Sequence, residues 1–315
     1  MMHIDKADVE RQLHFSELIA ALREAFCANI SVPQRQTLKL PDDASPLGIS
    51  LLMPAWNHTG YYGVKLVNIF PENSKQGLPG LHSVYVLFDG RTGVPLATLD
   101  GDVITSRRTA AAAALGVSLL ANPDASRLLV VGSGRVARLV APAIASVRPL
   151  TEVKVWSPTP ASAARCASEW QAMGIPAAPV SDLERAARAA DIISCATLAT
   201  SPLIQADWLQ PGSHLDLIGS FTPAMTEAAP ACFANAGVWV DTNEATQKAG
   251  DILNAVHDEF LKISQINGTM FDLCRGTCEG RTSSRQRTVF KAVGTALEDL
   301  AAAVTVYERS LQSLP

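Results

Sequence analysis

A glycine-rich turn between a buried strand and a helix is the first feature of this sequence with chemical meaning. Residues 128–131 are all apolar and lead directly into Gly132-Ser133-Gly134-Arg135-Val136-Ala137. In a G-x-G-x-x-G/A turn the first glycine permits the tight turn, the second admits a pyrophosphate, and the last position keeps the helix near the strand. The phosphates then lie at the positive end of the helix. The context predicts a dinucleotide site, although a glycine turn in some other α/β protein is the alternative.

The end of the next strand bears on which dinucleotide binds. An NAD site usually has Asp or Glu about 20 residues past the glycines, bonded to the ribose 2′-hydroxyl. Here residues 155–159 read Val-Trp-Ser-Pro-Thr, without a carboxylate. Ser157 and Thr159 can donate to a 2′-phosphate, and Arg135 or Arg165 can add positive charge. We therefore expect NADP(H) in preference to NAD(H).

Small polar residues end a later strand. Residues 191–197 finish in Ser-Cys-Ala-Thr, and Thr200 follows shortly after. Ligands of open α/β sheets bind beyond the carboxyl ends of strands, where the strand order reverses. Thr197 and Thr200 are therefore candidates for the ribose or the nicotinamide. An ordinary strand-to-loop cap is the alternative.

A lysine interrupts the apolar strand pattern of residues 63–69. Burial of an ammonium group is costly unless it is paired. Period-two alternation places Lys65 on the face of Val67 and Ile69. An arginine beside it would lower its pKa, which suits proton transfer near neutral pH. The alternative is a lysine that protects an edge strand from aggregation.

The first 120 residues contain the elements around Lys65. Residues 5–28 have the apolar spacing of one amphipathic helix. Short β-type runs separated by turn residues follow at 37–40, 49–54, 62–69, 83–88 and 95–99, with a hairpin turn at 89–93. They predict a mostly antiparallel sheet. A helix over 109–120 comes next, with Thr105 as its N-cap.

Beyond residue 122 strands alternate with helices. Strands are expected at 128–131, 152–156, 178–180, 192–196, 214–218 and 238–241, with helices ending near 146 and spanning 161–173 and 181–190. This alternation predicts an α/β protein with a Rossmann-type doubly wound parallel sheet. A last helix, from about 288 to 311, is expected beyond the final strand and able to return to the first domain.

Composition excludes several classes of protein. The 315 residues carry 26 Lys+Arg against 30 Asp+Glu, a net charge of −4, which argues against a nucleic-acid partner. No apolar stretch approaches the roughly 18–20 residues of a membrane span, and the N-terminus is too polar for a secretory signal. Six scattered cysteines suit buried thiols in a reducing cytoplasm. Cys274 and Cys278 lack a histidine pair, so we expect no metal site.

Blocks on both sides of the glycine turn resemble a known family. The blocks are Gly-Val-Lys-Leu-Val-Asn at 63–68, Gly-Leu-Pro at 77–79, Thr-Gly-Val-Pro-Leu at 92–96, Asp-Gly at 100–101, Ile-Thr-Ser-Arg-Arg-Thr-Ala-Ala at 104–111, Gly-Ser-Phe-Thr-Pro at 219–223, Gly-Asp at 250–251 and Val-Phe-Lys-Ala-Val-Gly at 289–294. With these blocks in the expected order over residues 33–299, the chain resembles the ornithine cyclodeaminase/mu-crystallin family.

The resemblance implies a homodimer and a range of reactions. It assigns substrate binding and dimerisation to an α+β domain of residues 1–120, joined by the C-terminal helix 293–315, and nucleotide binding to residues 121–292. Members convert ornithine into proline with bound NAD, reduce imino acids, dehydrogenate alanine or only bind ligands. The fold alone does not choose among these.

The resemblance also assigns roles to basic residues. Arg108 matches a carboxylate-binding arginine, whose guanidinium can hold a carboxylate through two charge-assisted hydrogen bonds. Arg35 matches a second one, and Lys65 matches a substrate-contacting or proton-donating lysine. His82 lies in a block that faces the substrate, although a lone histidine is as often structural.

One position departs from the cyclodeaminase pattern. After Gly219-Ser220 cyclodeaminases have an aspartate that acts as acid and base, whereas this chain has Phe221. Phenylalanine cannot take a proton, so a base would have to come from Asp251, Glu227 or a water on Lys65. An aromatic wall would instead cover a cyclic imine and exclude water. Simple core packing of Phe221 is the alternative.

These observations favour an NAD(P)H-dependent reductase of a cyclic α-imino acid such as Δ1-pyrroline-2-carboxylate, which would yield L-proline. Lys65 and Arg108 would be catalytic, and Arg35, His82 and Phe221 would also contact the substrate. Ornithine cyclodeaminase and a non-catalytic NADP-binding protein remain as alternatives. The residues expected at the nucleotide are Thr109, Gly132, Ser133, Gly134, Arg135, Val136, Trp156, Ser157, Thr159, Thr197, Thr200, Lys291 and Gly294.

Overall fold

The computed structural model describes residues 1–41, 47–58 and 60–312, which form two compact units. Unit 1 combines Met1–Arg108 with the chain from Thr295 onward, and unit 2 is Thr109–Gly294. The first boundary falls inside helix α3 (Gly101–Leu120) rather than at residue 120. The end of α3 packs within unit 2, because Arg148 donates to the Val117 carbonyl and a Cβ on Gly116 would lie 2.8 Å from the Phe290 ring.

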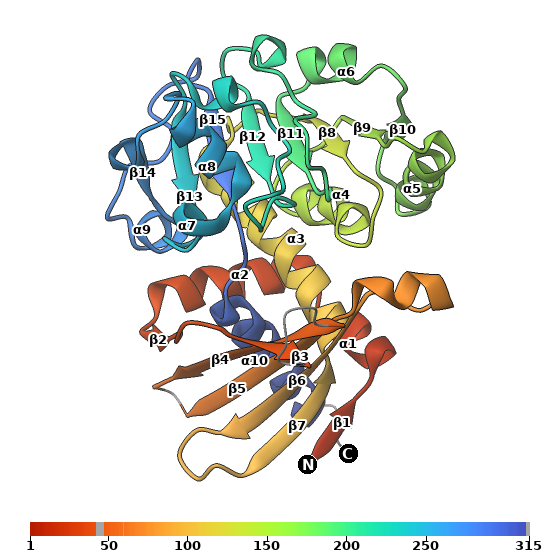
Figure 1. The fold of residues 1–315 in the computed structure, drawn as a ribbon, viewed down its shortest axis with the longest axis vertical. Helices are drawn as coiled ribbons and strands as arrows, with labels where there is room; N and C mark the ends of the chain where they lie inside the picture. Colours follow the sequence, from red (N-terminus) through yellow and green to blue (C-terminus); the bar gives the residue numbers. More distant parts are fainter. Residues whose placement is uncertain (42–46, 59, 313–315) are drawn as a thin grey trace. The chain divides into compact units, whose positions relative to one another are not determined.

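A seven-stranded sheet forms the centre of unit 1 (Figure 1). Its order is β1-β7-β6-β5-β4-β2, with β3 also paired to β4. Only the β1–β7 pair is parallel, so the prediction of a mostly antiparallel sheet is confirmed. The strands are β1 (Met2–Ile4), β2 (Ile30–Ser31), β3 (Gln36–Leu40), β4 (Gly48–Asn57), β5 (Tyr61–Ile69), β6 (Leu81–Asp89) and β7 (Pro95–Asp100).

The helices of unit 1 correct three expectations. Residues 5–28 form two helices, α1 (Lys6–Gln12) and α2 (Phe15–Cys27), because the backbone is extended at His14. Helix α3 begins at Gly101, and the Asp100 carboxylate, not Thr105, accepts from an amide of its first turn. The last helix, α10 (Ala296–Gln312), packs against α2 and strands β4, β5 and β6. It begins later than expected because residues 288–291 form a strand of unit 2.

Unit 2 contains an eight-stranded, all-parallel sheet, which confirms the doubly wound prediction. The order is β10-β9-β8-β11-β12-β15-β13-β14, and the direction of winding reverses between β8 and β11. Strands β14 and β15 were not expected. The strands are β8 (Arg127–Val131), β9 (Glu152–Trp156), β10 (Ala177–Pro179), β11 (Ile192–Cys195), β12 (His214–Leu217), β13 (Gly237–Val240), β14 (Ile266–Thr269) and β15 (Thr288–Lys291).

Helices connect these strands and bury an aliphatic core. They are α4 (Ala137–Ala145), α5 (Pro160–Ala172), α6 (Leu183–Ala189), α7 (Ala245–Lys248), α8 (Gly250–His257) and α9 (Met270–Arg275), with short 3-10 helices at Pro71–Gln76 in unit 1 and Ala206–Trp208, Pro230–Phe233 and Ile263–Gln265 in unit 2. Of the helices in the described ranges, none has the length and hydropathy for a bilayer crossing. All six cysteines are free, and Cys27 is exposed rather than buried as expected.

Candidate functional site

The glycine turn lies where the winding of the parallel sheet reverses. Gly132 follows β8 with φ of +118°, a conformation that strains any other residue. A Cβ on Gly132 would lie 2.6 Å from the Ala196 carbonyl oxygen and 3.3 Å from Thr197 Cγ2, so the turn packs on the loop after β11. A Cβ on Gly134 would meet no atom within 4 Å. The backbone at Gly134 is therefore open to an approaching ligand.

The loop after β9 meets this turn through hydroxyl groups. Ser133 Oγ and Ser157 Oγ lie 3.0 Å apart, and the Thr159 amide donates to Ser157 Oγ. Trp156 ends β9 half-buried, and Arg135 and Val136 precede α4. The open face at Gly134 together with these hydroxyls fits a dinucleotide phosphate group. The hydroxyl groups of this loop could donate hydrogen bonds to a 2′-phosphate, and residues 155–159 contain no acidic side chain that would repel one.

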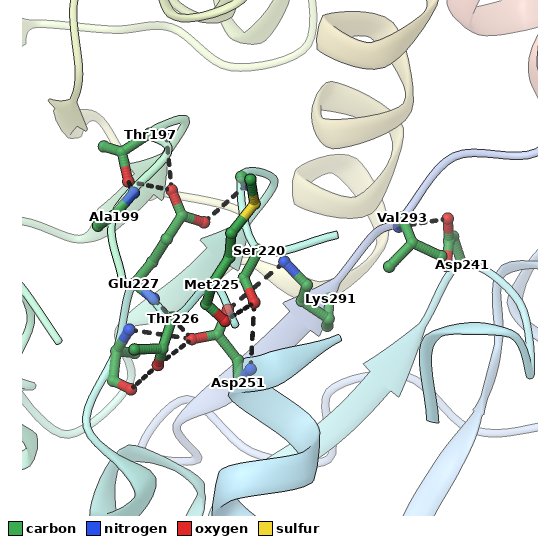
Figure 2. A network of polar contacts seen from close by, with 12 residues as sticks. Thr197, Ala199, Ser220, Met225, Thr226, Glu227, Asp241, Asp251, Lys291 and Val293 are labelled. Atoms are coloured by element: carbon green, nitrogen blue, oxygen red, sulfur yellow. Dashed lines mark hydrogen bonds and ion pairs between the residues drawn. The ribbon is translucent and has the colours of Figure 1, made fainter. Parts of the chain in front are cut away.

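Two residues expected at the nucleotide are buried inside unit 2. Lys291 on β15 is fully buried, with Nζ 3.4 Å from Asp251 Oδ2 (Figure 2). The Gly294 amide donates to Asp241 Oδ2 at 2.6 Å, and Asp241 also accepts from the Val293 amide. These contacts lock the segment after β15. Lys291 thus lies within the sheet and the Gly294 backbone is held by Asp241, and contact of either residue with a nucleotide stays a prediction.

The two carboxylates considered as replacement bases are also buried. Glu227 accepts from the amides of Thr197 and Gly219, and Asp251 accepts from the amides of Glu227 and Ala228. Both side chains are 0% exposed. Burial raises the pKa of Glu227, opposed by Lys291 and by the hydrogen bonds from Thr197. Neither carboxylate is placed to take a proton from a substrate.

Phe221, Thr197 and Thr200 lie at the surface of unit 2. Phe221 is 41% exposed, so the core-packing alternative is wrong. Thr197 is half-buried and Thr200 is exposed. Thr109, on α3 at the start of unit 2, is half-buried.

Unit 1 holds a buried ionic cluster of four side chains, which we call the Lys65 cluster: Lys65, Arg108, Glu298 and Asp299. Lys65 Nζ lies 2.7 Å from Asp299 Oδ2. Arg108 donates from Nε to Asp299 at 2.8 Å and from Nη1 to Glu298 at 2.5 Å. Asp299 and Glu298 are 0% exposed, Lys65 1% and Arg108 6%. Strand β5, helix α3 and helix α10 therefore bring two cations and two anions together.

Burial and pairing oppose each other in this cluster. Burial lowers the pKa of Lys65 to about 8, while Asp299 raises it and Arg108 lowers it further. The direction agrees with the sequence prediction, but burial rather than the arginine is the main cause. Burial also opposes the charge of Arg108, but Asp299 and Glu298 outweigh it and raise the Arg108 pKa. Arg108 and Lys65 in turn hold the pKa of Asp299 below its usual range against burial. Of these three groups, Lys65 is thus the one whose pKa moves toward neutral pH.

The register of the sheet decides between the alternatives for Lys65. Strand β5 pairs with both β4 and β6, so the edge-strand explanation is wrong. Lys65 lies opposite Tyr85 on β6, whose buried hydroxyl has no hydrogen-bond partner in the described part of the chain. His82, three residues before Tyr85, falls on the opposite face of the sheet and is exposed. His82 and Lys65 thus lie on different faces, and contact of His82 with a substrate stays a prediction.

Sequence reasoning missed Glu298 and Asp299. Both are acidic residues in the first turn of α10, where an anion also complements the helix dipole. The available signal was their position between Leu297 and Leu300, both of them buried. Arg35, between β2 and β3, is half-buried, and its expected contact with substrate stays a prediction. The bonds of Arg108 within the described residues use Nε and Nη1, so Nη2 can donate to a further acceptor.

Comparisons with known proteins agree with this geometry. The chain is 33% identical to Delta(1)-pyrroline-2-carboxylate reductase of Colwellia psychrerythraea, over 98% of this chain and 99% of the relative. The solved Delta(1)-pyrroline-2-carboxylate reductase of Thermococcus litoralis, in complex with NADH and L-proline, superposes with a TM-score of 0.92 at 28% identity, over 99% and 98% of the two chains. An archaeal alanine dehydrogenase dimer with bound NAD gives a TM-score of 0.92 at 29% identity, over 99% and 96%.

A family model matches almost the whole length of the sequence. The model described as the ornithine cyclodeaminase/mu-crystallin family covers residues 1–313. The blocks that carried the resemblance, from the strand of Lys65 to the strand of Lys291, all lie within this match. The chain therefore belongs to the ornithine cyclodeaminase/mu-crystallin family.

Proposed function

We propose that this protein reduces a cyclic α-imino acid of the Δ1-pyrroline-2-carboxylate type to the corresponding L-amino acid with NAD(P)H. The observation that carries the proposal is the Lys65 cluster, in which a buried ammonium with a pKa of about 8 lies beside a buried guanidinium. Such a cluster can hold a carboxylate and deliver a proton. Relatives named for this reduction support the choice of substrate.

Each residue of the cluster has a distinct part in the proposed reaction. Lys65 donates a proton to the ring nitrogen or orients it, and Arg108 binds the substrate carboxylate through Nη2, the nitrogen outside its bonds to Glu298 and Asp299. Reduced nicotinamide supplies the hydride for the C=N carbon when it is bound. The part that we propose for Phe221, as the resemblance implies, is to shield the ring from water; its side chain is exposed on unit 2. Arg35 adds a second positive charge for the carboxylate.

The nucleotide site favours NADP(H), with NAD(H) as the second choice. Gly132, Ser133, Gly134, Arg135 and Val136 would hold the pyrophosphate, with the α4 N-terminus behind it. Trp156, Ser157 and Thr159 would border the adenosine ribose, where hydroxyls and Arg135 suit a phosphate. Thr109, Thr197 and Thr200 would border the nicotinamide ribose. Lys291 and Gly294 would support this edge from within.

Three positions considered for the base of ornithine cyclisation are unsuited to that role, which leaves a water on Lys65 as the remaining candidate. Phe221 cannot titrate, and Glu227 and Asp251 are buried under backbone hydrogen bonds. We therefore assign the reduction as the function and treat both other activities as outcomes of its test.

We further propose a cytoplasmic homodimer formed through the outer face of the unit 1 sheet. This face is opposite to the one that α10 covers, and it presents Trp56, Tyr62 and Phe88, whose rings contact one another. Val84 on the same face is 40% exposed. Contiguous exposed apolar surface of this kind marks an interface. The six free cysteines suit a reducing compartment.

The experiment is an absorbance assay with purified protein. Δ1-pyrroline-2-carboxylate and NADPH are mixed with enzyme, and NADPH loss and proline formation are followed together. Equimolar loss and formation are expected. Ammonia from ornithine without net NADPH consumption would instead show cyclisation, and tight NADPH binding without any turnover would show a binding protein.

A further inference from the structure

We propose that Glu227 is the positioning residue of the nucleotide site, because its buried carboxylate joins the loop after β11 to the loop after β12. The first loop carries Thr197 and the second carries Phe221. The roles of these two residues rest on the proposed function, whereas the link between the loops does not. Glu227 thus acts through its neighbours and touches neither substrate nor nucleotide in this proposal.

Both oxygens of Glu227 are used in the link. Oε1 accepts from the Thr197 amide at 2.7 Å and from the Thr197 hydroxyl at 2.8 Å. Oε2 accepts from the Gly219 amide at 2.7 Å. Strands β11 and β12 are adjacent and parallel, so their carboxyl ends lie at the edge where ligands of such sheets bind. One side chain therefore fixes two loops at the edge that holds the glycine turn.

The two loops are in direct contact around this carboxylate. A Cβ on Gly219 would lie 1.9 Å from the Thr197 carbonyl oxygen and 2.4 Å from Glu227 Oε1. Only glycine fits there without displacing backbone. Because Gly132 also packs on Ala196 and Thr197, a shift of the β11 loop would reach the nucleotide turn itself.

A second buried carboxylate holds Glu227 in place. Asp251 Oδ1 accepts from the Thr226 hydroxyl and from the amides of Glu227 and Ala228, at 3.0, 2.7 and 3.1 Å (Figure 2). Its other oxygen lies 3.4 Å from Lys291 Nζ. Lys291 offsets part of the charge that Glu227 and Asp251 bring into the core. This explains why Lys291 lies inside a central strand, because its positive charge stabilises the two buried carboxylates.

The chemistry of the link requires a carboxylate. Its partners at both oxygens are donors, and an ionised carboxyl group is the side chain that only accepts. In Glu227→Gln the amide NH2 would face a backbone N–H at one end. The Thr197 end has two donors, the amide and the hydroxyl, so the glutamine oxygen should take that end. The NH2 group should then face the Gly219 N–H and loosen the loop of Phe221. The shape of the side chain is otherwise unchanged.

The test compares Glu227→Gln with a control at the opposite edge of the same sheet. Asp191 also bridges backbone amides with a carboxylate, since Oδ2 accepts from Ser126 and Arg127 just before β8. Asp191→Asn thus removes a comparable link at the amino ends of the strands. Thermal unfolding of all three proteins is measured first. NADPH affinity is then measured by fluorescence titration, and kcat and KM by NADPH oxidation.

We expect NADPH to bind Glu227→Gln at least tenfold more weakly than wild type and kcat to fall at least tenfold, while Asp191→Asn stays within twofold in both. Affinity and kcat within twofold of wild type in Glu227→Gln would overturn the proposal, and so would equal losses in both variants. If Glu227→Gln does not fold, Thr197→Val is used instead, because it removes one of the donors to Glu227. Its Kd for NADPH should rise about threefold or more, and an unchanged Kd would overturn the proposal. If the wild-type protein binds NADPH but reduces no imine, the proposed function is refuted. The NADPH affinities of the variants would still decide the role of Glu227.

Discussion

Replacement of Asp299 by asparagine would remove one charge from the Lys65 cluster and keep its shape. Asp299 is the residue that touches both cations, at 2.7 Å from Lys65 Nζ and 2.8 Å from Arg108 Nε. The groups that face Lys65 are Asp299 and Glu298 on α10, Arg108 on α3 and Tyr85 on β6. Asparagine can still accept from Arg108 but no longer favours the charged form of Lys65.

The size of the effect follows from the balance at Lys65. Its pKa of about 8, against 10.5 in water, corresponds to roughly 3 kcal/mol against the ammonium form, even with Asp299 present. An opposite charge at this range changes a pKa by about 1–3 units. Loss of Asp299 should therefore lower the Lys65 pKa further by that amount. If Lys65 must be protonated to act, activity is lost above its pKa, and this alkaline limb should move down by about 1–3 pH units.

The assay is the pH dependence of kcat/KM for NADPH-dependent reduction of Δ1-pyrroline-2-carboxylate. Wild type should lose activity above about pH 8, and Asp299→Asn at a lower pH. Asp299→Glu keeps the charge and serves as the matched control, with a limb close to that of wild type. Since loss of one partner of a buried pair costs about 3–5 kcal/mol, folding is verified by circular dichroism at each pH.

Two results would refute this reasoning. A limb that stays near pH 8 in folded Asp299→Asn would show that Asp299 does not control the proton on Lys65. A wild-type profile without any alkaline limb between pH 7 and 9 would show that the Lys65 ammonium is not required.

Four further predictions concern other parts of the molecule. Gly134→Ala should change the free energy of unfolding by less than about 1 kcal/mol, because its Cβ meets no atom within 4 Å. The same variant should bind NADPH at least tenfold more weakly in a titration. Gly219→Ala, with a Cβ 1.9 Å from a carbonyl oxygen, should lower the free energy of unfolding by about 1–3 kcal/mol or more. Ser157→Asp should shift the ratio of NADPH to NADH affinities by roughly 10–100-fold toward NADH, since the new carboxylate repels a 2′-phosphate; an unchanged ratio would place the 2′-phosphate elsewhere. Val84→Lys should yield monomers in size-exclusion chromatography with light scattering, whereas Met173→Lys, exposed on unit 2, should leave dimers. Burial raises the Asp216 pKa to about 7, so its neutral form stabilises the fold at low pH and this contribution is lost as pH rises through 7. In denaturant unfolding, the free energy of unfolding of Asp216→Asn should therefore rise relative to wild type by about 2–3 kcal/mol between pH 5 and pH 8. A pH-independent difference would contradict the assignment.

Local patterns in the sequence were enough for the parallel sheet and the glycine turn. Residues 128–131 are apolar on both faces because the strand is covered on both sides, and Gly132 must follow because only glycine tolerates its backbone angle and the contact with Ala196. These constraints act over a few residues, so a single sequence displays them.

The strand at residues 288–291 shows where such patterns fail. Its lysine interrupts the apolar run, and the Ala-rich stretch that follows made one long helix the better prediction. Lys291 is tolerated in the core because Asp251, forty positions earlier, lies beside it. A charge whose partner is remote in sequence looks like a surface residue until the fold is known.

The same limit applies to the candidate site. Lys65 was recognisable as an ammonium in a buried strand, but its partner Asp299 was not, because Asp299 lies 234 positions later in the chain. Glu227 was considered only as a possible base, and its linking role could not be predicted, since its three donors belong to loops that sheet pairing brings together. Phe221 was recognisable through the resemblance alone, and its exposure came from the structure.

The measurement closest to the central claim is the stoichiometry of the reaction with Δ1-pyrroline-2-carboxylate. NADPH loss at 340 nm and L-proline formation by chromatography are followed in one reaction, with Lys65→Met as the comparison. The account predicts one proline for each NADPH consumed by wild type and a loss of at least a hundredfold in kcat in the folded variant. No NADPH consumption with cyclic imines of either five- or six-membered rings, or equal turnover by Lys65→Met, would contradict it.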